Sequence, residues 1–226
     1  MSRRLWFFLA ASFLWGATQA EELKKTYYES GELKRTAPYV DGKLHGEVVD
    51  YYETGKPSEK TTYLDGQKTG PWAEFWEDGT KKSEATYKNG KLHGTLIRYF
   101  DDGKISQQIE YRDGVQHGTT LEYQRNGKLL SRAQFVDGKH DGAEELFDPA
   151  GKMYQRLEWQ AGRRNGVSRQ YRAVGTVERS DTYRDNRRLK TRWFDKNGVP
   201  TREEQYLEDG ALGKVLEGKD VKKDEP

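Results

Sequence analysis

Glycine recurs along this chain at a step of 24 residues, and this period constrains the fold more than any other feature. Three glycine series keep the step in phase, so composition alone cannot produce them. The chain is therefore predicted to consist of tandem repeats, each a small unit stacked on its neighbours. The series are Gly31, Gly55, Gly79, Gly103, Gly127, Gly151 and Gly175; Gly42, Gly66, Gly90, Gly114, Gly138 and Gly162; and Gly46, Gly70, Gly94, Gly118, Gly142 and Gly166.

Two aromatic positions recur once per unit, 12 residues apart. Between them lies a turn such as Asp78-Gly79 or Asn126-Gly127, and dipeptides of this kind predict β-hairpins. An apolar residue stands two positions before the first aromatic at Tyr51, Phe75, Tyr99 and Tyr123, which is the alternation of a strand. Each unit is therefore predicted to be two short antiparallel strands. The first aromatics are Tyr27, Tyr51, Phe75, Tyr99, Tyr123, Phe147 and Tyr171, and the second are Tyr39, Tyr63, Tyr87, Tyr111, Phe135, Trp159 and Tyr183.

The energetics of isolated hairpins favour a stack. Only 33% of the residues are apolar and 34% are charged, so the chain has little material for a globular core. A lone hairpin is marginal in water, whereas equivalent side chains in adjacent units gain about 0.2–1 kcal/mol per pair. We therefore predict an all-β fold: an elongated single row of antiparallel β-hairpins, with about seven to eight units.

The repeat pattern also predicts the domain boundaries. Residues 21–190 are predicted to form the hairpin repeats and residues 191–213 a degenerate C-terminal capping repeat, because Asn186 and Lys190 replace the expected glycines. Residues 214–226 are rich in charge and are predicted to be a flexible tail.

Residues 1–20 have the composition of a secretory signal peptide. Arg3 and Arg4 precede a mainly apolar stretch over residues 5–17, and small residues lead to a cleavage site near Ala20. The apolar stretch is shorter than the roughly 20 residues that a membrane span needs. We expect cleavage near Ala20 and a periplasmic or secreted protein; the alternative is a retained N-terminal anchor. Cysteine is absent, so disulfides cannot stabilise the exported chain.

The charge balance limits the classes of partner. Lys and Arg number 39 and Asp and Glu number 37, and removal of Arg3 and Arg4 makes these totals equal. A neutral mature chain has no general attraction for nucleic acid or anionic lipid. Nucleic-acid binding is therefore not expected, and binding to a membrane surface is disfavoured.

The unit Y-Y-E-x-G-K…Y-x-D-G-K-x-H-G, present at 51–56 and 39–46, resembles the MORN-repeat variant of bacterial proteins labelled YwqK-type toxin–antitoxin antitoxin components. The resemblance covers roughly residues 27–185. It implies a row of β-hairpins that contacts other proteins, and the antitoxin label implies a toxin or effector as partner. We expect an exported scaffold for protein–protein interaction; the alternative is an envelope- or lipid-associated protein of the same repeat class.

The histidines are the first residues to test for metal or catalytic chemistry. His45, His93 and His117 share one repeat position directly before a glycine, which Thr69 and Asp141 fill elsewhere. A position that accepts short polar residues indicates a turn, and a catalytic centre needs one asymmetric constellation rather than copies. We therefore predict a non-enzyme without a metal site, cofactor or small-molecule substrate.

Two groups of side chains are candidates for partner binding. Aromatic residues follow the first aromatic by one position in the N-terminal half, and aromatics are favoured anchors at interfaces; the same residues could instead pack between strands. Residues 163–192 carry a net charge of +7, which suits an acidic partner surface, although a solvated surface near the cap is the plainer interpretation. The candidates are Tyr28, Tyr52, Trp76 and Phe100, together with Arg163, Arg164, Arg187 and Arg188.

Overall fold

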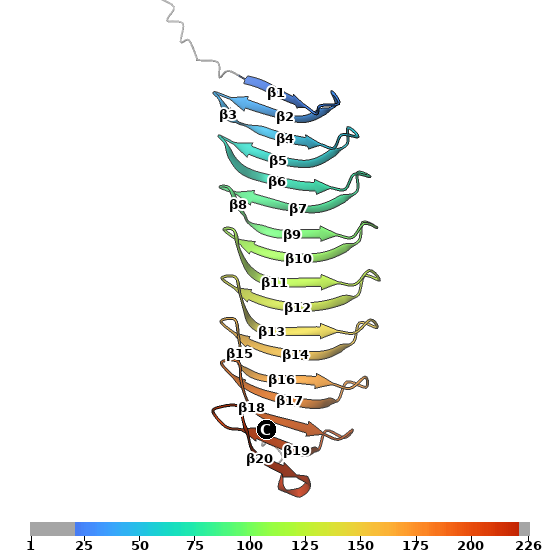
Figure 1. Cartoon of the computed structure of the whole chain (residues 1–226), viewed down its shortest axis with the longest axis vertical. Coiled ribbons are helices and arrows are strands. Elements are labelled where there is room, and N and C mark those ends of the chain that lie inside the picture. The colour runs from blue at the N-terminus through green and yellow to red at the C-terminus, as the bar shows by residue number, and fades with distance from the viewer. Residues whose placement is uncertain (1–20, 222–226) are drawn as a thin grey trace, which may run out of the picture.

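The computed structural model of this protein describes residues 21–221. Its regular structure consists of β-strands and one short 3-10 turn (Figure 1). The predicted signal peptide at 1–20 and the last five residues of the predicted tail lie outside the described residues. Figure 1 shows one elongated row of hairpins running from the N-terminal to the C-terminal end. The predicted fold class is confirmed.

Successive long strands pair antiparallel, and the short strands β3, β8 and β15 pair with the long strand before them, so the described chain forms one meandering sheet of 20 strands. A single 3-10 turn, η1, follows the last strand. The elements are β1 (Glu21–Tyr27), β2 (Leu33–Val40), β3 (Lys43–Leu44), β4 (Gly46–Tyr51), β5 (Pro57–Leu64), β6 (Gln67–Phe75), β7 (Lys81–Lys88), β8 (Lys91–Leu92), β9 (Gly94–Tyr99), β10 (Ile105–Arg112), β11 (Val115–Tyr123), β12 (Leu129–Val136), β13 (Lys139–Phe147), β14 (Met153–Gln160), β15 (Arg163–Arg164), β16 (Gly166–Tyr171), β17 (Val177–Arg184), β18 (Arg187–Phe194), β19 (Pro200–Tyr206), β20 (Leu212–Glu217) and η1 (Gly218–Asp220).

Two kinds of turn alternate along the chain, one at each edge of the sheet (Figure 1). At the edge that we call the loop edge, five-residue loops close the predicted hairpins; in the loop at 76–80, Trp76 N donates to Thr80 O at 2.8 Å and Gly79 N to Trp76 O at 2.9 Å. At the opposite edge, the D-G connections are two-residue turns in which both residues have positive φ, as in Asp41 (49°) and Gly42 (76°). Asn186 replaces the glycine of the seventh connection at φ 68°, a conformation that asparagine tolerates.

The strand register defines two faces, because residues paired across strands point to the same side. Face A carries the second aromatics, as the 2.8 Å hydrogen bond from Trp159 Nε1 to Glu144 shows. Face B carries Tyr123 of the first aromatics, whose hydroxyl lies 3.1 Å from Gln108 Oε1. The central row of face A includes Val48, Thr61, Trp72, Ala85, Leu96, Ile109, Thr120, Ala133, Glu144, Leu157, Ser168, Asp181 and Thr191, and that of face B includes Val49, Lys60, Ala73, Glu84, Ile97, Gln108, Leu121, Arg132, Glu145, Arg156, Arg169, Ser180, Arg192, Glu203 and Leu216.

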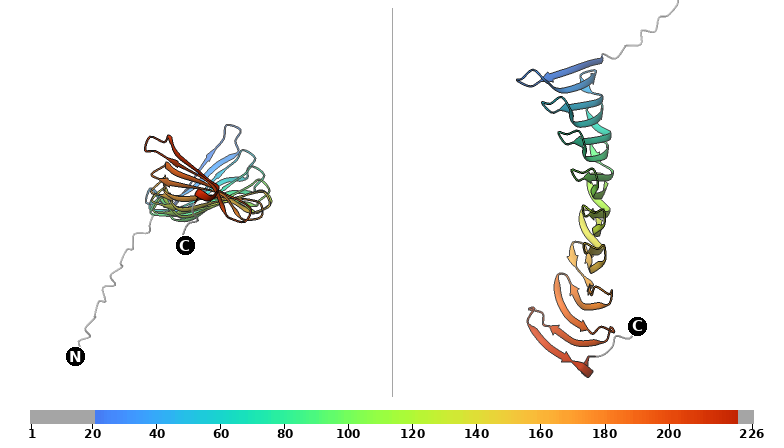
Figure 2. Two further views of the ribbon diagram at one scale, coloured as in Figure 1. Left: turned by 90° about the horizontal axis from the view of Figure 1, so that it is seen from below. Right: turned by 90° about the vertical axis from the view of Figure 1, so that its right-hand side faces the viewer.

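Residues 21–217 form no second layer over either face, and η1 packs against β19 beyond them; the sheet bends and twists along its length (Figure 2). Small residues such as Ala85 in the central row of face A are covered by neighbouring large side chains. Ala85, Leu96 and Ile109 form a buried cluster against which Trp72 and Tyr111 pack. The core is therefore a thin ladder that extends along the row of hairpins, as the low apolar content requires.

The C-terminal cap is longer than the sequence predicts. The strand β20 continues to Glu217 and pairs with β19, and Val221 beyond η1 is buried. The predicted end of the cap at Gly213 is therefore wrong, and the predicted flexible tail does not begin at residue 214. The periodicity could not show this, because the capping unit no longer follows the glycine pattern. Among residues 21–221, no helix is long and apolar enough to cross a membrane.

Candidate functional site

Side chains of the loop edge connect each loop to the next one along the row. Tyr28 Oη donates to the backbone oxygen of Tyr51 at 2.6 Å, and Tyr52 Oη repeats this bond to Phe75 O at 2.6 Å. Gln124 fills the equivalent position and donates to Asp148 O at 2.8 Å. Tyr28, Tyr52 and Gln124 therefore connect units by a hydrogen bond from the same repeat position, so the contact does not require an aromatic residue.

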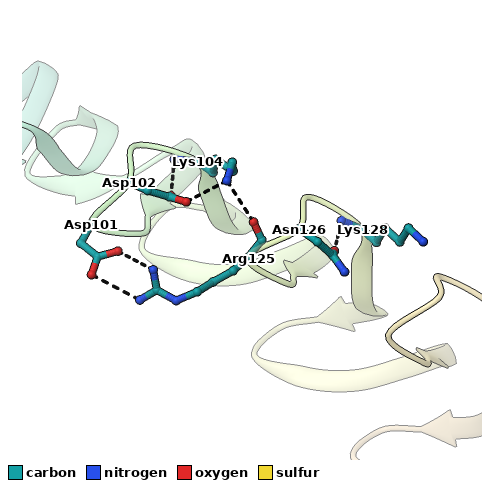
Figure 3. Close-up of polar contacts among 6 residues, drawn as sticks. All are labelled: Asp101, Asp102, Lys104, Arg125, Asn126 and Lys128. Atoms are coloured by element: carbon teal, nitrogen blue, oxygen red, sulfur yellow. Dashed lines mark hydrogen bonds and ion pairs between the residues drawn. The ribbon is translucent and has the colours of Figure 1, made fainter.

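Figure 3 shows how charged residues reinforce this connection. Arg125 donates to Asp101 Oδ1 at 2.5 Å, across a separation of 24 residues. Lys104 Nζ donates to Asp102 Oδ2 at 2.8 Å and to the backbone oxygen of Arg125 at 3.3 Å. The hydrogen bonds from Arg125 and Lys104 lower the pKa of Asp101 and Asp102, respectively, below the usual carboxyl value.

Each of the four candidate aromatics is the first residue of a loop. Strand alternation predicts that they point to the face opposite the first aromatics, but they lie at the loop edge instead. The structure brings them into one row along the loop edge. Trp76 is 37% exposed with Lys82 Nζ 4.8 Å from its ring centroid, and the Arg125 guanidinium lies 4.9 Å from the centroid of Phe100. The hydroxyls of Tyr28 and Tyr52 are engaged within the scaffold, so Trp76 presents the exposed aromatic surface of this row.

The four candidate arginines lie at the opposite edge, in two adjacent units. Arg163 contacts Asp185 at 3.7 Å, and the Arg164 guanidinium is 5.5 Å from the ring centroids of both Trp159 and Tyr183. These contacts tie the arginines to the neighbouring unit.

The second pair of arginines repeats this arrangement. Arg187 lies 4.0 Å from Glu208, a weakly held and exposed contact. Arg188 lies over the ring of Tyr206 at 4.4 Å and 4.0 Å from Asp181. Arg164 and Arg188 thus stack on aromatic rings, and the Arg188 side chain remains 43% exposed, against 36% for Arg187.

The histidines repeat a contact with the next D-G turn. His45, His93 and His117 place Nδ1 at 3.5, 3.2 and 3.4 Å from the aspartate 20 residues ahead. This is the turn role that the sequence predicts. No group of three or more potential metal ligands occurs in the part of the chain that the structure describes.

A cationic groove on face B near the C-terminal end distinguishes one part of the sheet from the rest. It has a volume of about 760 Å³ and lies across β16, β17, β18 and the following loop. Four of its lining residues are cationic and none is acidic: Arg169, Lys190, Arg192 and Lys196. The remaining lining residues include the hydroxyl-bearing Thr176, Ser180 and Thr182, and the apolar Val167, Val177 and Phe194.

One of the four cations is held by a buried ion pair. Arg192 donates to Glu203 Oε2 from Nε at 2.8 Å and from Nη2 at 2.5 Å, and both side chains are less than 8% exposed. Burial acts to raise the pKa of Glu203, but hydrogen bonds from Gln205 and Arg192 outweigh it and lower the pKa below its usual value. Glu203 thus offsets one charge and also lies 3.9 Å from Lys190.

Arg169 and Lys196 keep their charge available. Both are exposed, and neither forms an ion pair within the described chain. Sequence reasoning found the excess of charge in 163–192 but selected the turn arginines, because it could not assign each residue to a face. The strand register supplies that assignment: Arg169, Ser180 and Arg192 are successive partners across three strands.

The fold and its repeated inter-unit contacts define a single-layer hairpin-repeat scaffold. Comparison with protein families identifies five repeats of the MORN repeat variant, at residues 23–41, 44–65, 68–89, 92–113 and 116–137. This part of the chain therefore matches the MORN repeat variant in five successive units. A comparison with curated proteins finds no match.

Among solved structures, the chain is similar to the crystal structure of TcdB2-TccC3-Cdc42, with 10% identity and a TM-score of 0.23. The alignment covers 84% of this chain and 13% of that chain. It is also similar to a mutant of the Tc holotoxin pore of Photorhabdus luminescens, with 12% identity and a TM-score of 0.23, covering 83% of this chain and 12% of that one. This chain thus spans about an eighth of their length, and similarity at this level does not establish a shared fold.

Proposed function

We propose that this protein is a non-catalytic repeat scaffold that binds another protein across a face of its sheet. The observation that carries the proposal is a single sheet of 20 strands in which residues 21–217 form no second layer over either face. Such a sheet offers a long surface with side chains fixed by the register, which is how repeat proteins recognise their partners.

The narrower forms of this proposal come from the sequence. The signal-like composition of residues 1–20 supports export of the scaffold to the periplasm or out of the cell. The antitoxin resemblance makes a toxin or effector the partner, with binding alone, and no chemical step, providing neutralisation. An envelope-associated scaffold that binds lipid is the competing function, and the neutral mature charge disfavours it.

Site-specific photo-crosslinking in the native host tests the proposal. A photoreactive phenylalanine analogue is placed at Lys60 on face B and at Arg98 on face A, each in the full-length chain. The same probe at Val174, which is 76% exposed on the loop edge, serves as the control. We expect a protein adduct of defined mass from at least one face and none from the loop position.

Vesicle sedimentation gives the competing result. Anionic phosphatidylglycerol vesicles should not sediment the purified residues 21–226 above the level of neutral vesicles. Salt-sensitive sedimentation together with no protein adduct from either face would overturn the proposal in favour of lipid binding.

A further inference from the structure

We propose that the cationic groove on face B binds an acidic, extended peptide segment of the partner protein. The inference rests on the proposed function and names the chemistry of the partner at one place on the scaffold. Its starting point is the groove's composition: four cationic lining residues, no acidic one, and a volume of about 760 Å³, which is within the range of ligand sites.

The free charge of the groove is concentrated in side chains that the fold does not use. Arg192 is committed to Glu203, and Lys190 lies 3.9 Å from the same carboxylate. Arg169 and Lys196 are exposed and carry no ion pair within the described chain. A ligand with carboxylates would therefore meet charges that need not first be released from internal partners, so little interaction energy is lost on binding.

The spacing of Lys190, Arg192 and Arg169 fits an extended chain. Lys190 and Arg192 are two residues apart on one strand and share face B, which separates their Cα atoms by about 6.6–7 Å. Arg169 and Arg192 are separated by one intervening strand, or about 10 Å. Alternate side chains of an extended peptide are also about 6.6–7 Å apart, so acids at every second position can address successive cations.

Neutral groups in the groove favour a peptide over a bare anion. Phe194 and Val177 give an apolar floor beside the cations. Thr176 also lines the groove, and its buried hydroxyl oxygen has no hydrogen-bond partner within the described chain. A peptide supplies both apolar contacts and backbone hydrogen-bonding groups, whereas a phosphate ion would use the charges alone.

Fluorescence anisotropy tests the proposal on purified residues 21–226, with a labelled octapeptide of alternating glutamate and serine as the probe. Its matched control replaces every glutamate with glutamine. The groove variant is Arg169→Glu/Lys196→Glu, which leaves the Arg192–Glu203 pair intact. Lys43→Glu/Lys91→Glu is the control variant, because it changes two exposed lysines on β3 and β8, far along the row, by the same charge.

We expect the acidic peptide to bind the native chain, and the groove variant to bind it about tenfold or more weakly at low salt. The control variant should keep the native affinity, and the glutamine peptide should not bind. Where circular dichroism shows that the charge reversal unfolds the cap, Arg169→Gln/Lys196→Gln provides the same comparison without introducing acids.

Equal binding to the native chain and the groove variant, or no binding to the native chain, would overturn the assignment of the groove. If phosphatidylglycerol vesicles displace the labelled peptide at a lipid concentration lower than the peptide concentration that saturates the groove, the groove would be assigned to lipid instead. The two proposals fail separately, because a protein adduct from Lys60 or Arg98 would still support the scaffold when the groove does not bind the peptide.

Discussion

The hydroxyl of Tyr52 donates to the backbone oxygen of Phe75, 2.6 Å away, at the end of β6 in the next hairpin. Tyr28 makes the same bond to Tyr51 one unit earlier, and Gln124 makes an equivalent one further along. Tyr52, which the sequence suggests as a residue of a binding surface, therefore forms a hydrogen bond that connects one unit to the next. The loop edge is thus a second line of nearest-neighbour contacts, beside the backbone ladder of the sheet.

Removal of one such hydrogen bond should weaken the scaffold locally. Tyr52→Phe should lower the free energy of unfolding by about 0.5–1.5 kcal/mol, because the backbone oxygen of Phe75 loses its side-chain donor. Urea denaturation followed by circular dichroism measures this. Tyr154→Phe is the control, since Tyr154 is 42% exposed and has no such bond in the described chain. A loss of partner binding at unchanged stability would instead place Tyr52 in the interface.

The buried pair of Arg192 and Glu203 should be costly to break. Arg192→Met leaves the Glu203 carboxylate buried with a hydrogen bond from Gln205 and with Lys190 3.9 Å away, so unfolding should become easier by roughly 3 kcal/mol. The double variant Arg192→Met/Glu203→Leu should recover most of that loss. Lys81→Met, which breaks the more exposed pair with Glu84, should cost less than about 1 kcal/mol. Equal losses in the two single variants would contradict this account.

The same carboxylate should contribute to acid sensitivity. The pKa of Glu203 is lowered in the folded protein, so the unfolded chain binds the proton more tightly. Its stabilising contribution is therefore present above the ordinary glutamate pKa and is lost as the pH falls through the folded value. Thermal unfolding between pH 7 and pH 3 should show a shallower decline for Glu203→Gln than for the native chain. Glu208→Gln, at a 95% exposed side chain, should follow the native curve.

The loop-edge pair of Asp101 and Arg125 should be visible as a pKa change with little effect on stability. The hydrogen bond from Arg125 holds the pKa of Asp101 below its usual value. Arg125→Gln should therefore raise the pKa of Asp101 in a carboxyl carbon NMR titration, while the pKa of Asp78, held low mainly by Thr80, stays unchanged. An unchanged Asp101 titration would show that the pair does not form in solution.

Tyr99 should ionise well above the ordinary tyrosine pKa. Burial, together with its hydrogen bond to Glu84, raises the pKa of Tyr99 to about 12. Ultraviolet difference titration of the native chain and Tyr99→Phe isolates its signal. Glu84→Gln should lower this pKa because it removes the neighbouring negative charge, whereas Glu122→Gln should not. A Tyr99 signal near the ordinary tyrosine value would contradict the contact.

The repeat unit was readable from sequence because hairpins impose local rules. The D-G turns need two residues with positive φ, so glycine and aspartate recur at fixed positions such as Asp41 and Gly42. The alternation of Val49 and Tyr51 reports strand geometry in the same way. The capping unit broke these rules, and its true extent to Val221 became visible only from pairing and burial.

The candidate site was less accessible to sequence reasoning. The excess of arginine in 163–192 was evident, but its members separate into edge residues, such as Arg163, and face B residues, such as Arg169. Tyr28 and Tyr52, which were expected in an exposed aromatic stripe, instead donate hydrogen bonds to the backbone of the next unit. Bulges at each loop shift the register, so counting residues does not tell which face a side chain reaches.

By itself, the sequence determined the period, the hairpin unit and the all-β row, since turn chemistry and strand alternation act over a few residues. The tertiary structure alone decided which side chains share a face, which charges are neutralised and where a cationic groove forms. Those outcomes depend on pairing between strands, such as Arg169 with Ser180 and Ser180 with Arg192, which are 11 and 12 positions apart. Strand register is a property of the assembled sheet, and a local pattern does not contain it.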